Sequence, residues 1–438
     1  MLTLTGITLE DAAMDDASID HKRAAREAAY AMPLEEINPA DPEMHRSDTL
    51  WAYFERLRAE DPVHWAQSGF DDIGGYWSIT RYNDIMAVDT DHETFSSDPT
   101  IVLPDPEADF TLPMFIAMDP PKHDVQRKTV SPIVSPHNLA NLEPIIRERA
   151  GVILDDLPIG ETFDWVDKVS IELTTMTLAT LFDFPWEDRR KLTRWSDVAT
   201  AAPDSGLFRS TEKEAAEQQR REELFECVDY FMRLWNERVN APPKSDLISM
   251  LAHGESTRNM DRMEYLGNLI LLIVGGNDTT RNTITGSILA LSQNPEQERR
   301  LRENPALIPS MVSETIRWQT PLAYMRRRAT RDVEFGGKLI REGDKVAMWY
   351  ISGNRDDTVI DRPNDYWIER PLVRRHLSFG FGIHRCVGNR LAELQLKIIW
   401  EEILKRFPKI EVMGPPRRVY SSFIHGYEQL PVMIPTRN

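Results

Sequence analysis

The stretch that decides the fold is Phe379-Gly380-Phe381-Gly382-Ile383-His384-Arg385-Cys386-Val387-Gly388, near the C-terminal end of the chain. It holds one of only two cysteines, Cys386, among glycines that let the backbone approach a flat group closely. After it, apolar side chains recur at helical spacing from Leu391 to Leu404 and stop before Pro408. We therefore expect Cys386 at the N-terminal end of a helix, where backbone N–H groups would stabilise its thiolate.

The residues alone leave two readings of Cys386 open. One is a buried structural cysteine in a glycine-rich turn; the other is an axial ligand of a haem iron, which needs a thiolate in a dry pocket lined by N–H groups. Zinc is excluded because the other cysteine, Cys227, has no C-x-x-C spacing around it.

The loop resembles the haem-binding loop of the cytochrome P450 family, which it matches at Phe379, Gly382, His384, Cys386 and Gly388. The resemblance implies a haem b cofactor with Cys386 as its metal ligand. It also implies the fold of that family, mainly α-helical with a smaller β-rich lobe.

Composition sets limits on the class of protein. The 438 residues are long for one domain, 41% are hydrophobic, and the net charge of -18 argues against a nucleic-acid partner. Two cysteines give no disulfide framework, which favours a reducing, cytoplasmic location. We expect no membrane anchor, because residues 1–16 do not read as a signal peptide and the most apolar run, Leu269 to Val274, is too short to cross a bilayer.

The order of patterns along the chain suggests an extension at residues 1–40, with a short helix at His21 to Tyr30, and one domain at residues 41–438. A helix is expected from Thr49 to the residue before Asp61, followed by two strands around Gly74-Gly75 and a hairpin around Gly336-Gly337. The middle third, residues 143–258, reads as helices interrupted by prolines.

A long proline-rich loop at residues 97–121 precedes a candidate anion site. His123 and Arg127 stand four apart, so they share one face if this segment is a helix. Two such donors suit an anionic group. The segment also resembles the Asp-Pro-Pro-x-His-x-x-x-Arg segment of the family, which implies that both residues bind haem propionates.

A single long helix is expected from about Asp261 to Ser292, capped by Asn259. Its middle reads Gly275-Gly276-Asn277-Asp278-Thr279-Thr280, and paired glycines favour a kink. A Thr hydroxyl beside a carboxylate at such a gap could relay protons.

Two other readings of this segment are an ordinary buried helix and a phosphate-binding strand–turn–helix, which lacks both glycine fingerprints. The segment resembles the oxygen-activation motif of the family. The resemblance implies that Asp278 and Thr279 are catalytic and that Gly275 lies against the cofactor.

Three further features concern the scaffold of the loop. Glu314 and Arg317 are three apart and resemble the structural Glu-x-x-Arg of the family, whose third partner is best matched by Arg370. Asn354-Arg355-Asp356 keeps that assignment open. The three consecutive arginines Arg326-Arg327-Arg328 indicate an anionic partner. The resemblance favours Arg327 as a propionate ligand, although either neighbouring arginine could take that role.

These motifs predict a haem-thiolate monooxygenase that uses O2 and receives electrons from a [2Fe-2S] ferredoxin and its reductase. Basic residues cluster in sequence around the thiolate side and could steer an acidic donor: Lys122, Arg127, Lys128, Arg374, Arg375, Arg385, Arg390 and Lys397. A peroxide-driven fatty-acid peroxygenase and a non-catalytic haem sensor or electron carrier are the alternatives. The acid–alcohol pair at Asp278-Thr279 argues against both.

The segment from Val274 to Thr283 and the acidic N-terminus look most like the bacterial branch that hydroxylates terminal methyl groups of alkanes. We therefore expect a medium-length linear apolar substrate. By analogy, the cavity walls would include Leu271, Val274, Leu322 and Phe423, beside the apolar loop from Ile101 to Met118. Terpenes or other bulky apolar molecules remain the alternative substrates.

Overall fold

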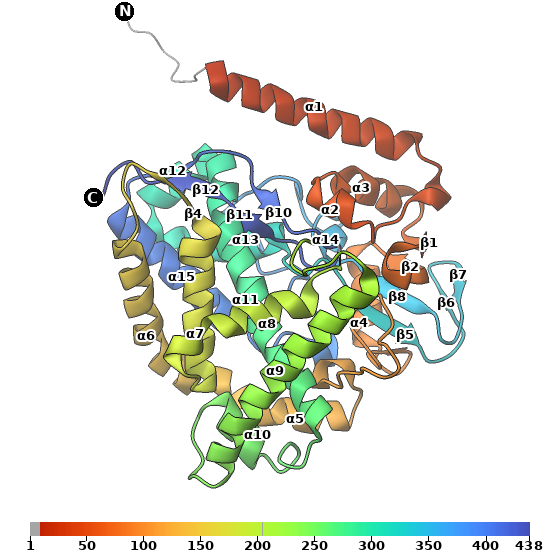
Figure 1. Ribbon diagram of the computed structural model, residues 1–438. Helices are drawn as coiled ribbons and strands as arrows, with labels where there is room; N and C mark the ends of the chain where they lie inside the picture. The colour runs from red at the N-terminus through yellow and green to blue at the C-terminus, as the bar shows by residue number, and fades with distance from the viewer. Residues whose placement is uncertain (1–8, 204) are drawn as a thin grey trace, which may run out of the picture.

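A computed structural model describes residues 9–203 and 205–438, in which a large body of packed helices lies beside a smaller lobe of β-structure (Figure 1). The helices are α1 Leu9–Ala31, α2 Pro42–Arg46, α3 Leu50–Glu60, α4 Tyr82–Thr90, α5 Lys122–Val130, α6 Pro136–Asp155, α7 Glu172–Phe182, α8 Arg190–Thr200, α9 Lys213–Val239, α10 Leu247–His253, α11 Arg262–Gln293, α12 Pro295–Glu303, α13 Ile308–Gln319, α14 Tyr350–Gly353 and α15 Asn389–Arg406. The expected fold class, mainly α with a smaller β-rich lobe, is confirmed.

The β-lobe is built around a five-stranded sheet with strand order β1-β2-β8-β5-β3. Three smaller sheets pair β10 with β11, β4 and β9 with β12, and β6 with β7. The strands are β1 Val63–Ser68, β2 Gly74–Ile79, β3 Phe95–Ser96, β4 Thr162–Asp164, β5 Met325–Ala329, β6 Val333–Phe335, β7 Lys338–Ile340, β8 Lys345–Met348, β9 Glu411–Val412, β10 Arg417–Arg418, β11 Tyr427–Gln429 and β12 Pro431–Met433. The two expected strand pairs appear as β1–β2 and β6–β7.

Helix α11 runs through the middle of the helical body (Figure 1). Its cap is Asp261, whose side chain accepts hydrogen bonds from the backbone of Met263 and Glu264, so the expected cap at Asn259 is wrong by two residues. The helix is continuous through Gly275 and Gly276, and Leu269 to Val274 is helical, which removes the strand–turn–helix reading.

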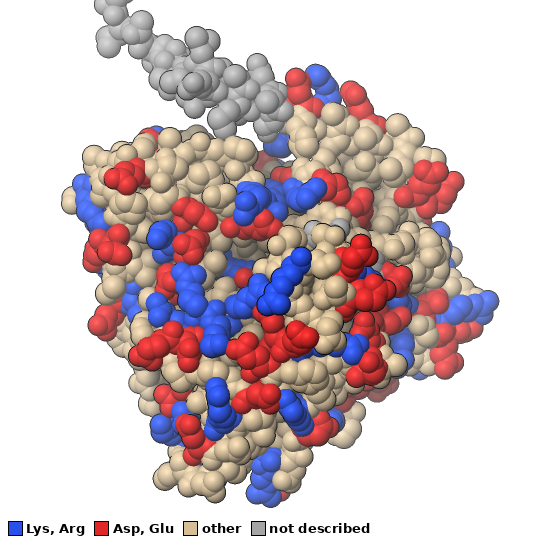
Figure 2. Space-filling view, viewed as in Figure 1, with Lys and Arg blue, Asp and Glu red and all other residues tan. Residues whose placement is uncertain are grey.

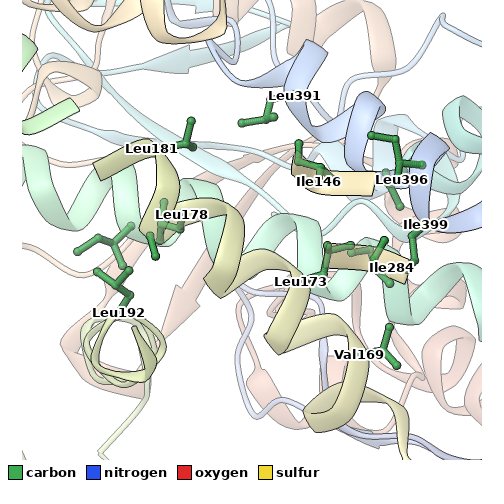
Figure 3. Packing of buried hydrophobic residues seen from close by; sticks show 14 of the residues in the cluster. Ile146, Val169, Leu173, Leu178, Leu181, Leu192, Ile284, Leu391, Leu396 and Ile399 are labelled. Carbon is green, nitrogen blue, oxygen red and sulfur yellow. The ribbon is translucent and has the colours of Figure 1, made fainter. Parts of the chain in front are cut away.

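The hydrophobic core fills the space around α11. Figure 3 shows Ile146 of α6, Leu173 and Leu178 of α7, Ile284 of α11 and Ile399 of α15 converging from separate helices. The aliphatic side chains in this cluster are almost fully buried, and burial of this kind contributes about 25 cal/mol for each Å² of apolar surface removed from water. The core therefore fixes α11 and α15, which border the site.

The N-terminal segment packs against the β-lobe side of the molecule. Helix α1 is much longer than the expected helix at His21 to Tyr30, and Arg26 pairs with Glu55 of α3 at 2.7 Å. Ile37 and Ala40 are buried in a hydrophobic cluster with Phe54 of α3 and Tyr76 of β2, so residues just before position 41 contact the main body closely. Residues 1–8 of the expected extension lie outside the described residues.

Within the described part of the chain, no helix combines the length and the apolar character that crossing a bilayer requires. On the face shown in Figure 2, acidic and basic side chains are interspersed.

Candidate active site

The loop that carries Cys386 is bent by two glycines. Gly380 and Gly382 have φ angles of +65° and +64°, and a Cβ on Gly382 would lie 2.6 Å from the carbonyl oxygen of Asp89. The amide of Cys386 donates to the carbonyl of Phe379 at 2.8 Å, which closes the loop just before α15 begins at Asn389. Only glycine tolerates both the left-handed backbone and the close approach.

The electrostatic surroundings of Cys386 act in opposite directions. Burial raises the pKa of its thiol, whereas hydrogen bonds from the backbone of Gly388 and Asn389 and the charges of Arg127 and Arg385 act to lower it. The N–H donors are those expected from a helix N-terminus. A cation bonded to the sulfur would stabilise the thiolate further.

A cavity of about 650 Å³ opens over this loop. Phe379, His384, Cys386 and Gly388 line one side of it, and Gly275 and Thr279 of α11 also line it. Gly382 lies behind the lining, against Asp89, and shapes the loop. The structure thus brings the two sequence motifs to one space.

Unpartnered donors mark the edge of the cavity. His123 Nε2 and both ring nitrogens of His384 are buried without a hydrogen-bond partner, and the two rings lie 4.3 Å apart. Burial, followed by the charge of Arg327, lowers the pKa of His384. His384, Arg127 and Arg327 line the cavity, whereas His123 contacts His384 from outside the lining. Buried polar atoms without partners are costly, and an anionic group with several acceptor oxygens would satisfy them. These residues therefore fit a haem with propionates at this edge.

The three consecutive arginines of β5 have different surroundings. Arg326 donates to the carbonyl of Leu103 at 3.0 Å, and Arg328 pairs with Asp98 at 3.1 Å near the surface. Of the three, Arg327 is the one that lines the cavity, and it pairs with Asp89 at 2.7 Å. The geometry favours the residue that the resemblance favoured.

Asp89 is a site residue that sequence reasoning missed. It is 2% exposed and accepts hydrogen bonds from Arg327, from the hydroxyl of Tyr350 at 2.9 Å and from the backbone of Phe381 at 2.8 Å. One carboxylate thus ties β5 to the cysteine loop. An isolated Asp at the end of a short helix gave no signal in the sequence.

Thr279 and Asp278 are adjacent in sequence but face different surroundings. The hydroxyl of Thr279 lies on the cavity and donates to the carbonyl of Gly275 at 2.9 Å. Asp278 is fully buried outside the cavity lining and accepts from Ser196 of α8 at 3.0 Å. Thr279 lines the cavity and Asp278 does not. A proton path from Asp278 to the cavity therefore needs a further link between the two side chains.

Burial raises the pKa of Asp278 to about 6, against the opposing charge of Arg281, which lies 3.1 Å away. Thr200 of α8 is a second partner at 3.4 Å, and Asp197 of the same helix pairs with Arg281 at 2.7 Å. Because its pKa is near neutrality, Asp278 can both hold and release a proton at physiological pH.

The scaffold of the loop is a buried polar network. Glu314 and Arg317 are fully buried and pair at 2.7 Å, and Arg370 reaches Glu314 at 3.0 Å, as the resemblance implied. Arg317 also donates to the carbonyl of Asn354 at 2.9 Å, and the side chain of Asn354 accepts from the backbone of Leu377 at 2.7 Å. The network thus leads from α13 directly to the start of the cysteine loop.

The rest of the cavity is largely apolar. The expected walls Leu271, Val274, Leu322 and Phe423 all line it. So does most of the expected loop, at Ile101, Val102, Phe110, Leu112, Met114, Phe115 and Ile116. Ala199, Thr200 and Leu224 of α8 and α9 also contribute, and sequence reasoning missed them because their patterns read only as helices.

Known proteins resemble the chain over nearly its whole length. The family model described as cytochrome P450 matches residues 77–418. A solved structure titled CYP153D17, from a Sphingomonas species, is 48% identical, with a TM-score of 0.83 over 90% of this chain and 98% of that one. Linalool 8-monooxygenase of Pseudomonas putida is 34% identical over 92% of this chain and 99% of its own.

A third relative, the methyl-branched lipid omega-hydroxylase of Mycobacterium bovis, is 30% identical over 91% of this chain and 96% of its own. The family of these proteins implies a haem-thiolate cofactor, which the loop and the unpartnered donors fit. The chain belongs to the cytochrome P450 family and is a haem-thiolate monooxygenase.

Proposed function

We propose that this monooxygenase hydroxylates the terminal methyl group of medium-length linear apolar molecules such as n-alkanes. The observation that carries the proposal is the cavity: its lining surface is mostly apolar, and it holds both Cys386 and Thr279 of α11. A chain without polar groups leaves no buried donor or acceptor unsatisfied there. Two of the similarities support this proposal: the one to the structure titled CYP153D17 and the one to the methyl-branched lipid omega-hydroxylase.

Cys386 would ligate the iron of haem b, and His123, Arg127, Arg327 and His384 would hold its propionates. The bound cofactor supplies reductive activation of O2 and transfer of one oxygen atom to a C–H bond.

The side chains of the cavity orient the substrate. Each methylene group that Leu271, Val274, Leu322 and Phe423 shield from water should contribute about 0.8 kcal/mol to binding. Affinity should therefore rise with chain length until the cavity is full. A primary C–H bond is stronger than the secondary bond beside it, so terminal attack requires that these walls position the chain end and restrain the second carbon.

The hydroxyl of Thr279 would hold a proton at the cavity, and Asp278 would replenish it. Asp278 is bound by Ser196 and Thr200 of α8, so a water molecule or a rearranged side chain must link its carboxyl to Thr279. This acid–alcohol pair supports an O2-dependent enzyme over a peroxide-driven one.

Electrons would come from a small acidic [2Fe-2S] ferredoxin with its own reductase. The basic cluster around the thiolate side supports this donor: Lys128, Arg374, Arg385 and Arg390 are exposed, and Arg127 donates to the backbone of Arg385. Cys227 is buried, and together with a cysteine committed to iron it leaves no pair for a disulfide, which supports a reducing, cytoplasmic location.

Oxidation of terpenes is the second candidate, which the similarity to linalool 8-monooxygenase favours. Product analysis with n-octane and linalool, each supplied with O2, ferredoxin and reductase, separates the two. Mainly 1-octanol is expected from octane. Mainly 2- and 3-octanol, or brisk linalool oxidation without octane turnover, would end the terminal-hydroxylase proposal. Turnover with hydrogen peroxide alone at the same rate would favour a peroxygenase.

A further inference from the structure

A chain of polar contacts runs from the exposed side chain of Lys122 to the wall of the cavity. It begins at Lys122, the first residue of α5, whose ammonium group lies 3.0 Å from the carboxylate of Glu264 in the first turn of α11. The side-chain amide of Gln126 donates to the same carboxylate. Gln126 in turn accepts from the amide of Asn268 at 3.2 Å.

The last link reaches the cavity itself. The backbone N–H of Phe115 donates to the side-chain oxygen of Asn268 at 3.0 Å, and Phe115 lines the cavity. The neighbouring backbone is pressed against the same helix: a Cβ on Gly267 would lie 2.2 Å from the carbonyl oxygen of Pro113. The cavity wall around Phe115 is thus fastened to α11 at consecutive residues.

The direction of each bond is fixed. The oxygen of Asn268 accepts from a backbone N–H, so its NH2 group must face the oxygen of Gln126, whose NH2 group must then face Glu264. Gln126, Glu264 and Asn268 are at most 8% exposed. A change at one member therefore leaves a buried group of the next unsatisfied.

Lys122 is the exception, because its side chain is 54% exposed. It is also one of the basic residues that cluster in sequence around the thiolate side and could steer an acidic donor. A charge on the surface can therefore act on a wall of the cavity through three buried side chains.

We propose that Lys122 is a positioning residue for the cavity wall at Phe115, acting through Glu264, Gln126 and Asn268. An acidic partner that draws Lys122 away from Glu264 loosens this wall. The looser wall then lowers the affinity for a substrate that fills the cavity. The link to substrate rests on the proposed function, whereas the link from Lys122 to Phe115 does not.

The test compares two variants of the haem-loaded protein that lose the same charge from the same helix. Lys122→Gln removes the pair with Glu264, and Lys128→Gln is the matched control, because Lys128 is also exposed on α5. Lys122→Gln should speed amide hydrogen exchange in the peptide that contains Phe115 by about two- to fivefold, the range of an exposed ion pair. Lys122→Arg should restore the slow exchange, and the melting temperature should stay within the range of the control.

Equal exchange at Phe115 in Lys122→Gln and Lys128→Gln would overturn the inference, as would faster exchange throughout the protein. Asn268→Asp provides a second variant, because it keeps the acceptor for Phe115 and loses the donor to Gln126. It should also speed exchange at Phe115, and unchanged exchange would contradict the chain.

Binding of n-octane, followed by the haem absorbance, then tests the link to substrate. Lys122→Gln should weaken it by about two- to fivefold relative to Lys128→Gln, and equal affinity would remove that link. If octane fails to bind even the unaltered protein, the proposed function fails, while the exchange comparison still decides the role of Lys122.

Discussion

At the scale of single residues, Cys386 has the simplest prediction. Replacing it with Ser removes the thiolate, so the reduced carbon-monoxide complex should lose its red-shifted Soret band. Cys227→Ser is the control, because that side chain is fully buried on α9. An unchanged band in Cys386→Ser would show that another group ligates the iron.

Thr279 is tested through the yield of product per electron. Thr279→Ala removes the hydroxyl from the cavity, so the enzyme should still consume reductant but divert it to hydrogen peroxide or water. Thr279→Ser keeps a hydroxyl that can donate to Gly275 and should retain most of the yield. Full coupling in the Ala variant would remove the proton role.

The raised pKa of Asp278 predicts that the stability of the protein depends on pH. Its pKa in the folded chain, about 6, lies above the ordinary value of 3.8, so folding favours the protonated form. The contribution of this group to stability is therefore complete below about pH 4 and is lost as the pH rises through about 6, by on the order of 3 kcal/mol. Asp278→Asn should lack this loss. Identical dependence of the melting temperature on pH in both proteins, from pH 4 to 7.5, would contradict the prediction.

At the scale of elements, the contact between α13 and the cysteine loop is the one most sensitive to a single substitution. Glu314 neutralises both Arg317 and Arg370 in a fully buried site, so Glu314→Gln should destabilise the protein by about 3–5 kcal/mol and lower its haem content. The control is Glu296→Gln on α12, whose carboxylate is half exposed and pairs with Arg299 at the surface. Equal melting temperatures in Glu314→Gln and Glu296→Gln would show that the buried triad does not stabilise the protein.

Which elements could be predicted depended on whether their signal was local. The long helix α11 and the helix after Cys386 have apolar periodicity and proline boundaries, and both formed where expected. Strand β4 was missed because three residues with their pairing partner at β12 give no local pattern. The partners of Asp278 on α8 were missed for the same reason, since only the packing of α8 on α11 brings Ser196 to that carboxylate.

At the scale of the whole molecule, the net charge of -18 coexists with a cluster of basic residues around Cys386 in the sequence. If Arg385 and Lys397 help to steer an acidic ferredoxin, the rate of haem reduction should fall steeply as ionic strength rises, and more weakly in Arg385→Glu or Lys397→Glu. Arg299→Glu on α12 is the control for net charge. Reduction rates that are indifferent to salt and to both reversals would exclude Arg385 and Lys397 from the docking site.

The site as a whole could be predicted because its motifs are short and contiguous, whereas its supports come from distant segments. Cys386, Thr279 and Arg327 were found from sequence and line one cavity. Asp89, which holds Arg327 and the loop together, was not found, because its role exists only once β5, α4 and the loop have met. Motifs identify the chemistry, and packing determines which groups hold it in place.

The pairing of β12 with β4 and β9 also constrains how the protein is made. A ribosome adds roughly 5–20 residues each second, so β4 emerges tens of seconds before the strand that completes its sheet. During that time the edge of β4 that pairs with β12 in the folded protein has no partner. We expect nascent chains to need protection from aggregation until β12 appears, and a stop codon just before Pro431 to yield insoluble protein.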